Sequence, residues 1–126
     1  MATIKSYTDI EQSKKLAEIL PIESADMGYL WNGTSFCEYA VSNQTIFKKV
    51  ENIPCWSLAS MINVLPQFIE FKGDKYYLRF MKEYVEYAND EVSITGRCLH
   101  TTGNDNLVDA CVEMILKLHE HKMLRS

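Results

Sequence analysis

The stretch Asn106-Leu-Val-Asp-Ala-Cys-Val-Glu-Met-Ile-Leu-Lys-Leu-His-Glu-His121 carries the clearest periodic pattern of the chain. Its apolar residues recur at intervals of three and four, which is the spacing of one face of an α-helix. Capping residues precede the pattern, and its acidic residues come early and its basic residues late, which complements the helix dipole. The sequence therefore predicts a helix over 106–121 whose apolar stripe packs on a sheet.

The segment before this helix, from Gln67 to His100, is rich in Tyr, Phe, Val and Ile. Gly73-Asp74 and Asn89-Asp90 are turn candidates within it, so the pattern favours an antiparallel meander. The expected strands lie near 67–72, 75–81, 84–88 and 92–101. A competing interpretation places a helix over 76–88, because Tyr77, Met81 and Tyr84 also keep helical spacing.

The N-terminal half predicts two helices and a hairpin. Thr8 and Glu11 have the spacing of a capping box, which predicts a helix over 9–20 that stops at Pro21. Asn32-Gly33 predicts a type I′ turn between strands at 28–31 and 35–41. Pro54 and Pro66 bracket an apolar stripe that begins at Cys55, which predicts a helix over 54–65. The expected fold is one α+β domain over 1–126, an antiparallel sheet of about five or six strands packed by about three helices.

Composition and charge exclude several classes of protein. The chain has 126 residues, of which 47% are hydrophobic, and a net charge of −4. That charge argues against a nucleic-acid partner, whose binding needs a basic surface. The sequence has neither an apolar stretch of membrane-spanning length nor a secretory signal pattern, so we expect a soluble cytoplasmic protein with no membrane partner and reduced thiols.

Cys55, in the first turn of the helix expected over 54–65, is the strongest candidate for a reactive side chain. A cysteine in the first turn of a helix can have its thiolate stabilised by the helix dipole, and His100 is the best candidate for its base. The same Cys55 also starts the apolar stripe of the expected helix, and reduced cysteines are usually core residues. We favour the structural role and keep the pair Cys55 and His100 as a weak catalytic candidate.

The spacing of cysteines, histidines and glycines gives little support for a metal or cofactor site. Cys98 and His100 would share one face of a strand, but two ligands do not make a structural zinc site. His119 and His121 are two positions apart on a helix and point in different directions. The glycines are dispersed and form no phosphate-binding loop. We therefore expect neither a metal nor another cofactor.

Aromatic content exceeds what so small a domain needs, with 7 Tyr, 2 Trp and 5 Phe. Such side chains are enriched in the centres of interfaces, although they also fill cores. In a homo-oligomer, the aromatic side chains that the core does not need would be buried between subunits. Arginines would bind any anionic group of a ligand. The candidate ligand-binding or interface residues are Trp31, Trp56, Tyr76, Tyr77, Arg79, Tyr84, Tyr87 and Arg97.

Three blocks, Leu20–Met27, Ile53–Pro66 and Asp105–Glu120, occur together in this order. In that respect the chain resembles a family of small uncharacterised proteins encoded in gut bacterial genomes and their phages. The resemblance implies a mobile-element context and no assigned activity. It suggests a non-enzymatic binding protein, of a host-interaction or anti-defence type, that sequesters a small molecule or occludes a host protein. A small hydrolase using Cys55 and His100 is the alternative, and a structural subunit of a phage particle is the third hypothesis.

Overall fold

The computed structural model describes residues 5–41, 44–81, 83–89, 96–102 and 104–124. The described residues form three α-helices and seven strands in two antiparallel sheets, which confirms the α+β class. The prediction of a single sheet with about five or six strands is wrong, because the three strands between residues 27 and 55 form a separate sheet. The helices are α1 (Ile10–Ala17), α2 (Leu58–Val64) and α3 (Leu107–Glu120).

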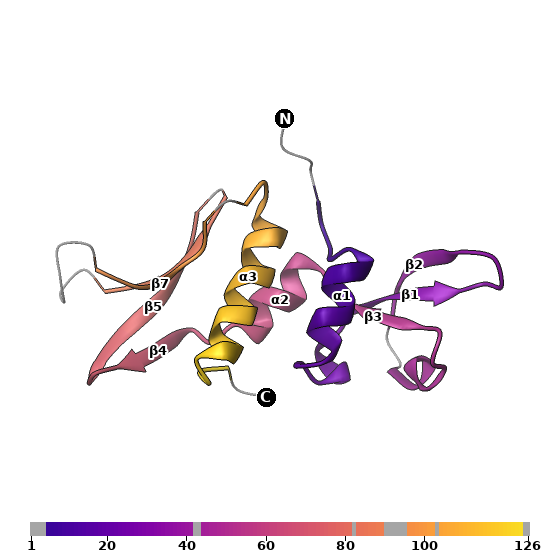
Figure 1. Cartoon of the computed structure of the whole chain (residues 1–126), viewed down its shortest axis with the longest axis horizontal. Coiled ribbons are helices and arrows are strands. Elements are labelled where there is room, and N and C mark those ends of the chain that lie inside the picture. The colour runs from indigo at the N-terminus through magenta and orange to yellow at the C-terminus, as the bar shows by residue number, and fades with distance from the viewer. Residues whose placement is uncertain (1–4, 42–43, 82, 90–95, 103, 125–126) are drawn as a thin grey trace. The chain divides into compact units, whose positions relative to one another are not determined.

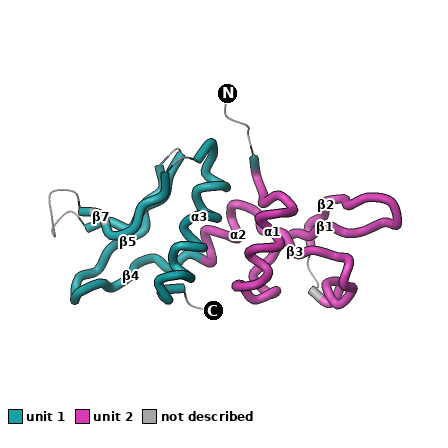
Figure 2. Tube along the Cα trace, viewed as in Figure 1, with its two compact units in different colours: residues 1–5, 65–125 teal, residues 6–64, 126 magenta. Residues whose placement is uncertain are grey.

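The chain separates into two compact units, coloured in Figure 2. Unit 1 comprises Met1–Lys5 and Leu65–Arg125, and unit 2 comprises Ser6–Val64 and Ser126. We describe each unit by itself. The expectation of a single domain stays a prediction.

Unit 2 is built on a three-stranded sheet of order β2-β1-β3. The strands are β1 (Met27–Trp31), β2 (Phe36–Ala40) and β3 (Ile53–Cys55), accompanied by the 3-10 helices η1 (Ile22–Ser24) and η2 (Gln44–Lys48). Phe47 of η2 lies against Gly28 so closely that a Cβ there would stand 2.9 Å from its ring. The glycine is therefore required for this close approach.

Helix α1 begins one residue later than the predicted capping box implies. Asp9 is the N-cap, and it exchanges hydrogen bonds with Gln12 in the capping box that we had assigned to Thr8 and Glu11. Thr8 is fully buried, and its hydroxyl is engaged inside the unit instead of at the helix terminus. The helix ends at Ala17 rather than at residue 20, since Glu18 and Ile19 already bond three residues back.

The β1–β2 hairpin is confirmed, but its predicted type I′ turn is wrong. Trp31 pairs with Phe36, so four residues, Asn32 to Ser35, form the loop. Asn32 does not adopt a positive φ, and its side-chain oxygen instead accepts the backbone N–H groups of Thr34 and Ser35. This Asx-type arrangement replaces the turn expected from the dipeptide.

The predicted helix over 54–65 is wrong in its first turn. Ile53–Cys55 is strand β3, and Pro54 lies opposite Gly28 with its ring nitrogen on the edge that faces away from β1. Helix α2 starts only at Leu58. Its buried residue is Met61, whereas Ala59 and Ile62 of the predicted stripe are exposed.

Unit 1 confirms the predicted meander as a four-stranded sheet of order β4-β5-β6-β7. The strands are β4 (Phe68–Phe71), β5 (Asp74–Phe80), β6 (Val85–Ala88) and β7 (Arg97–His100), so the competing helix over 76–88 is wrong. Residues 90–95, with part of the predicted 92–101 strand and Asp90 of one turn candidate, lie outside the described residues.

A two-residue turn joins β4 to β5. Phe71 pairs with Asp74, and Lys72 and Gly73 both have positive φ, at 54° and 86°. These are the values of the type I′ turn that we had expected at Asn32-Gly33. The turn sets the register of β4 against β5 and, with it, the residues that share each face.

Helix α3 confirms the prediction for 106–121, with Asn106 as its N-cap and His121 as its C-cap. It packs against β6 and β7 (Figure 1). The core of this unit includes Val85 and Tyr87 from the sheet, together with apolar residues of the helix. Among the described residues, no helix has the length and apolar character needed to cross a membrane.

Candidate binding surface

The register of the four-stranded sheet brings several predicted site residues to one face. Side chains alternate between the faces of a strand, and directly paired residues share a face. Tyr87 lies on the face that packs in the core, since it is fully buried on a strand that contacts α3. This burial raises the pKa of its hydroxyl, and Cys111 of α3 adds to the shift. We call the opposite side the Tyr77 face; it is made of Phe68, Glu70, Lys75, Tyr77, Arg79, Glu86, Ala88 and His100.

A row of charged and polar residues crosses the Tyr77 face. Arg79 pairs with Glu86, and Glu86 pairs with His100, so three adjacent strands place these side chains next to one another. Arg79 Nη1 lies 3.8 Å from Glu86 Oε2, and only 8% of the Glu86 side chain is exposed. A carboxylate at such depth needs a counter-charge. Arg79 is therefore held at the sheet surface by Glu86.

Two aromatic rings lie beside this row. Phe68 and Tyr77 pair across β4 and β5, with ring centroids 6.1 Å apart. Tyr77 is 53% exposed and Phe68 is 37% exposed. Lys75 Nζ lies 4.6 Å from the centroid of the Phe68 ring, which is the geometry of a cation–π contact. These side chains present a large apolar area to solvent with a cation at its margin.

Tyr84, which directly precedes β6, extends the row on its other side. Its ring lies 5.0 Å from the ring of His100. The backbone carbonyl of His100 accepts a hydrogen bond from Lys117 of α3, so the strand end that carries the histidine is tied to the helix. The fold thus gathers Tyr77, Arg79, Tyr84 and His100, four residues that the sequence nominated for different reasons.

Other predicted interface residues lie elsewhere. Tyr76 and Tyr87 are buried in the core of unit 1, and the Tyr87 hydroxyl donates to the carbonyl of Pro66 at 2.7 Å. Trp56 is fully buried in unit 2, where its indole nitrogen donates to Ser24 Oγ at 2.9 Å. These three side chains therefore belong to cores and do not present an exposed binding surface.

The remaining two nominated residues are Trp31 and Arg97. Trp31 is exposed near the tip of the β1–β2 hairpin, with its ring 5.0 Å from that of Phe36. Arg97 begins β7 opposite Ala88, and its side chain lies outside what the structure describes.

Sequence reasoning missed Phe68, Lys75 and Glu86. The missing signal was the position of the turn. With Lys72-Gly73 as the two-residue turn, counting outward pairs Phe68 with Tyr77, and so places Lys75 on the same face as both rings. Glu86 gave no local signal, because its role comes from the two strands that flank it.

Cys55 lies in a different environment from the one the nucleophile hypothesis requires. It ends strand β3 and is fully buried, so it is not in the first turn of a helix. Burial raises the pKa of its thiol, although hydrogen bonding with Thr8 works in the opposite direction. A protonated buried thiol is a poor nucleophile. In addition, Cys55 belongs to unit 2 and His100 to unit 1.

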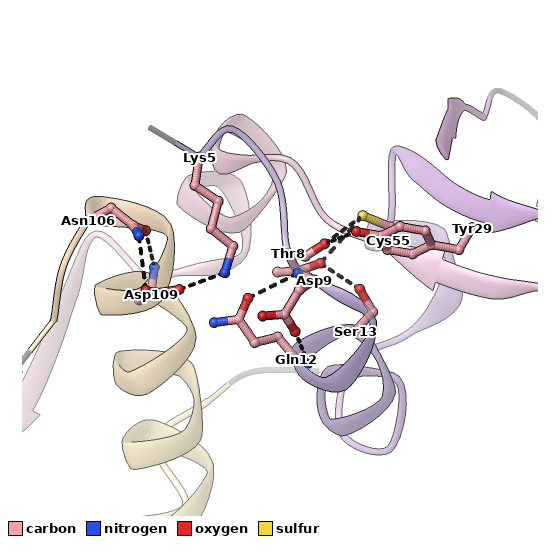
Figure 3. Close-up of polar contacts among 9 residues, drawn as sticks. All are labelled: Lys5, Thr8, Asp9, Gln12, Ser13, Tyr29, Cys55, Asn106 and Asp109. Atoms are coloured by element: carbon pink, nitrogen blue, oxygen red, sulfur yellow. Dashed lines mark hydrogen bonds and ion pairs between the residues drawn. The ribbon is translucent and has the colours of Figure 1, made fainter. Parts of the chain in front are cut away.

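The surroundings of Cys55 form a buried polar cluster centred on Thr8 (Figure 3). Thr8 Oγ1 lies 2.7 Å from Ser13 Oγ and accepts the backbone N–H of Trp56 at 3.2 Å. The Cys55 thiol donates to the Thr8 carbonyl at 3.4 Å, and the Tyr29 hydroxyl donates to the same oxygen at 2.8 Å. Every contact satisfies a polar group in the interior, so the cluster has a structural role.

Asp26 and Ser57 make a further close polar contact in unit 2. The Asp26 carboxylate accepts hydrogen bonds from the backbone and hydroxyl of Ser57, just before α2. Burial works to raise the pKa of Asp26, but the hydrogen bonds from Ser57 and Ser60 together lower it. The aspartate therefore anchors the start of the helix to the loop before β1.

The residues considered for metal binding do not form a cluster. Cys98 and His100 are both half-buried on β7, and the sheet register shifts beside Cys98. Within the described ranges, no three His, Cys, Asp or Glu side chains are placed to hold a metal ion.

The fold and the surface define an α+β protein that displays aromatic and charged side chains on one face of an antiparallel sheet. Comparison with known proteins found no matching family model, no matching curated protein and no matching solved structure.

Proposed function

We propose that this is a non-enzymatic binding protein and that the Tyr77 face of its four-stranded sheet binds a partner protein. The observation that carries the proposal is the pair of exposed rings, Phe68 and Tyr77, directly beside the Arg79–Glu86 row. Protein interfaces typically combine an aromatic centre with a charged margin. The face offers both within two adjacent strand pairs.

The charges on this face favour a protein over a polyanion. Lys75 and Arg79 are balanced by Glu70 and Glu86 on the same face, and the chain as a whole has a charge of −4. A nucleic-acid surface would instead need an excess of cations. The resemblance to proteins of gut bacteria and their phages supports a host protein in the cytoplasm as the partner, which the binding would occlude.

Affinity purification of the tagged chain from its source organism, with mass spectrometry of what is retained, tests the proposal. Tyr77→Ala should lose the retained partner, because it removes the most exposed ring of the face. Phe71→Ala is the matched control, since Phe71 belongs to the same hairpin, is 42% exposed and points to the opposite face. Retention of the partner by Tyr77→Ala, or equal loss with both variants, would refute the Tyr77 face as the binding surface.

A further inference from the structure

Strand β2 is an open edge of the three-stranded sheet in unit 2. It pairs only with β1, because the sheet order is β2-β1-β3. Val41 N–H donates to Asp26 O, and Ser35 O accepts from Asn32 N–H, so odd-numbered residues of this strand face β1. The backbone groups of Phe36, Glu38 and Ala40 therefore point outward, and within the described residues no second strand pairs with them. The Glu38 N–H bonds the carboxylate of its own side chain, which a pairing strand would replace.

This edge lacks the features that usually block pairing. Natural edge strands are protected by lysine, by proline or by a covering segment. Phe36-Cys-Glu-Tyr-Ala40 contains no lysine, arginine or proline, and its single charge, Glu38, accepts a hydrogen bond from the Tyr7 hydroxyl at 2.7 Å. In contrast, β3 contains Pro54, and the chain around Tyr7 bonds to the residues that follow it. Strand β4 contains Glu70 and is followed directly by Lys72.

We propose that two copies of this chain pair through their β2 edges, antiparallel and centred on Tyr39, to form one continuous six-stranded sheet. Pairing around a two-fold axis uses the same strand twice, so each donor of one copy meets an acceptor of the other. The residues whose groups would be joined are Glu38 and Ala40, through about four backbone hydrogen bonds.

Side-chain chemistry favours this register over the one centred on Glu38. Centring on Glu38 would place two like charges opposite each other, which destabilises a strand pair. Centring on Tyr39 instead places Glu38 opposite Ala40 of the second copy, and Cys37 opposite its Val41. The two Tyr39 rings, each 54% exposed in the single chain, then cover one another. The same strand that leaves its edge open thus also offers an apolar stripe that matches itself.

This inference does not rest on the proposed function. The β2 edge lies in unit 2 and the Tyr77 face lies in unit 1, so either can fail without the other. A strand pair alone buries less area than a standard stable interface, so we expect a dimer that dissociates on dilution.

Sedimentation velocity of the full chain from about 10 μM to about 1 mM tests the pairing. The wild type should shift from monomer to dimer with concentration. Ala40→Pro should remain monomeric: it removes an outward N–H and leaves the bonds to β1 intact, and proline is tolerated at such positions. Glu70→Pro is the matched control, because it removes an outward N–H from the edge of β4 and should leave dimerisation unchanged.

Disulfide trapping tests the register separately. Tyr39→Cys should form a linked dimer under mild oxidation, since opposed residues of such a pair lie about 4.5 Å apart at Cα. The wild type should not link through Cys37. Circular dichroism checks the fold of each variant, and Tyr39→Lys, which should also abolish dimerisation, replaces Ala40→Pro if that variant does not fold. A wild type that stays monomeric at the highest concentration, or dimers lost with Glu70→Pro but not with Ala40→Pro, would overturn the proposal.

Discussion

The two sheets bury their polar groups in opposite ways. In the three-stranded sheet, hydroxyl, thiol and backbone groups around Thr8 satisfy one another in the interior. In the four-stranded sheet, the buried Glu86 carboxylate lies beside the partly exposed Arg79 guanidinium on the Tyr77 face. Neutral groups can be enclosed once their hydrogen bonds are made, whereas a charge needs a counter-charge and access to solvent. The difference indicates that the first arrangement supports the fold and that the second presents a surface.

Loss of the largest core ring in either unit should have the largest effect. Trp56→Ala and Tyr87→Ala each remove a fully buried side chain, so we expect each to lower the free energy of unfolding by about 3–5 kcal/mol. Urea unfolding measures the loss. Trp31→Ala is the control, since Trp31 is exposed. A loss at Trp31 as large as at Trp56 would contradict the assignment of the core.

Alkaline pH should distinguish the buried thiols of the two units. Burial raises the pKa of Cys111 from 9.0 to about 12. Between these values the unfolded chain releases a proton that the folded chain keeps, so stability is complete below pH 9 and falls as the pH rises, by at most about 1.4 kcal/mol per pH unit. Cys111→Ala should flatten this slope when urea unfolding is measured at several pH values.

Cys55→Ala should flatten the alkaline slope less than Cys111→Ala, because hydrogen bonds to Thr8 oppose the effect of burial on the Cys55 pKa. A slope unaffected by Cys111→Ala would show that other groups, such as the buried tyrosines, produce it.

Removal of a single buried hydroxyl should show how much the interior cluster contributes. Thr8→Val keeps the side-chain shape but leaves the Trp56 N–H and the Ser13 hydroxyl without their partner, so we expect a loss of about 2–3 kcal/mol. Thr101→Val removes a hydroxyl that bonds only the backbone of Val85 in unit 1 and should lose less. Equal losses, measured by thermal and urea unfolding, would mean that the cluster adds nothing beyond the hydrogen bonds that a single isolated hydroxyl makes.

The charged row should be less sensitive because it is partly solvated. Arg79→Ala removes the partly exposed guanidinium beside the buried Glu86 carboxylate and should lower stability by about 1–2 kcal/mol. Adding Glu86→Gln to this variant should restore part of the loss, since no buried charge then remains. Lys75→Ala, on the same face but exposed, is the control in urea unfolding. Failure of Glu86→Gln to compensate would show that Arg79 acts through packing alone.

The two hairpin turns should give the smallest effects. Gly33 and Gly73 have φ values of 101° and 86°, and a Cβ at either position would meet no atom within 4 Å. Gly33→Ala and Gly73→Ala should therefore cost only backbone strain, about 1 kcal/mol each, as measured by thermal unfolding. Gly28→Ala is the contrast, because its Cβ would collide with Phe47 and should cost more.

The local sequence patterns predicted the helices and strands better than the residues at which these elements begin, end and turn. Helix α3 and the strands of unit 1 follow from periodicity because long apolar patterns restrict the chain to one geometry. Pro54 was misassigned because proline suits both the first turn of a helix and the edge of a strand. The type I′ turn expected at Asn32-Gly33 does not form there, and the turn expected at Gly73-Asp74 lies one residue earlier, at Lys72-Gly73. Strand pairing and side-chain hydrogen bonds outweigh the preference of a dipeptide.

The candidate site was predictable only in part. The sequence nominated Tyr77 and Tyr84 for their aromatic rings, Arg79 for an anionic group and His100 as a candidate base. It also nominated Trp56, Tyr76 and Tyr87 for their rings, and these three are buried. Aromatic residues are used in cores and in interfaces alike. Only the strand register separates the exposed members from the buried ones.

By itself, the sequence determined the α+β class, the amphipathic helix at 107–120 and the antiparallel meander that precedes it. These depend on contacts near in sequence and on the period of the apolar pattern. The tertiary structure decided that the strands divide between two sheets, that Cys55 is enclosed by Thr8 and Ser13, and that Arg79, Glu86 and His100 stand in one row. Each of these depends on which residues distant in sequence become neighbours, and local propensity carries no information about that pairing.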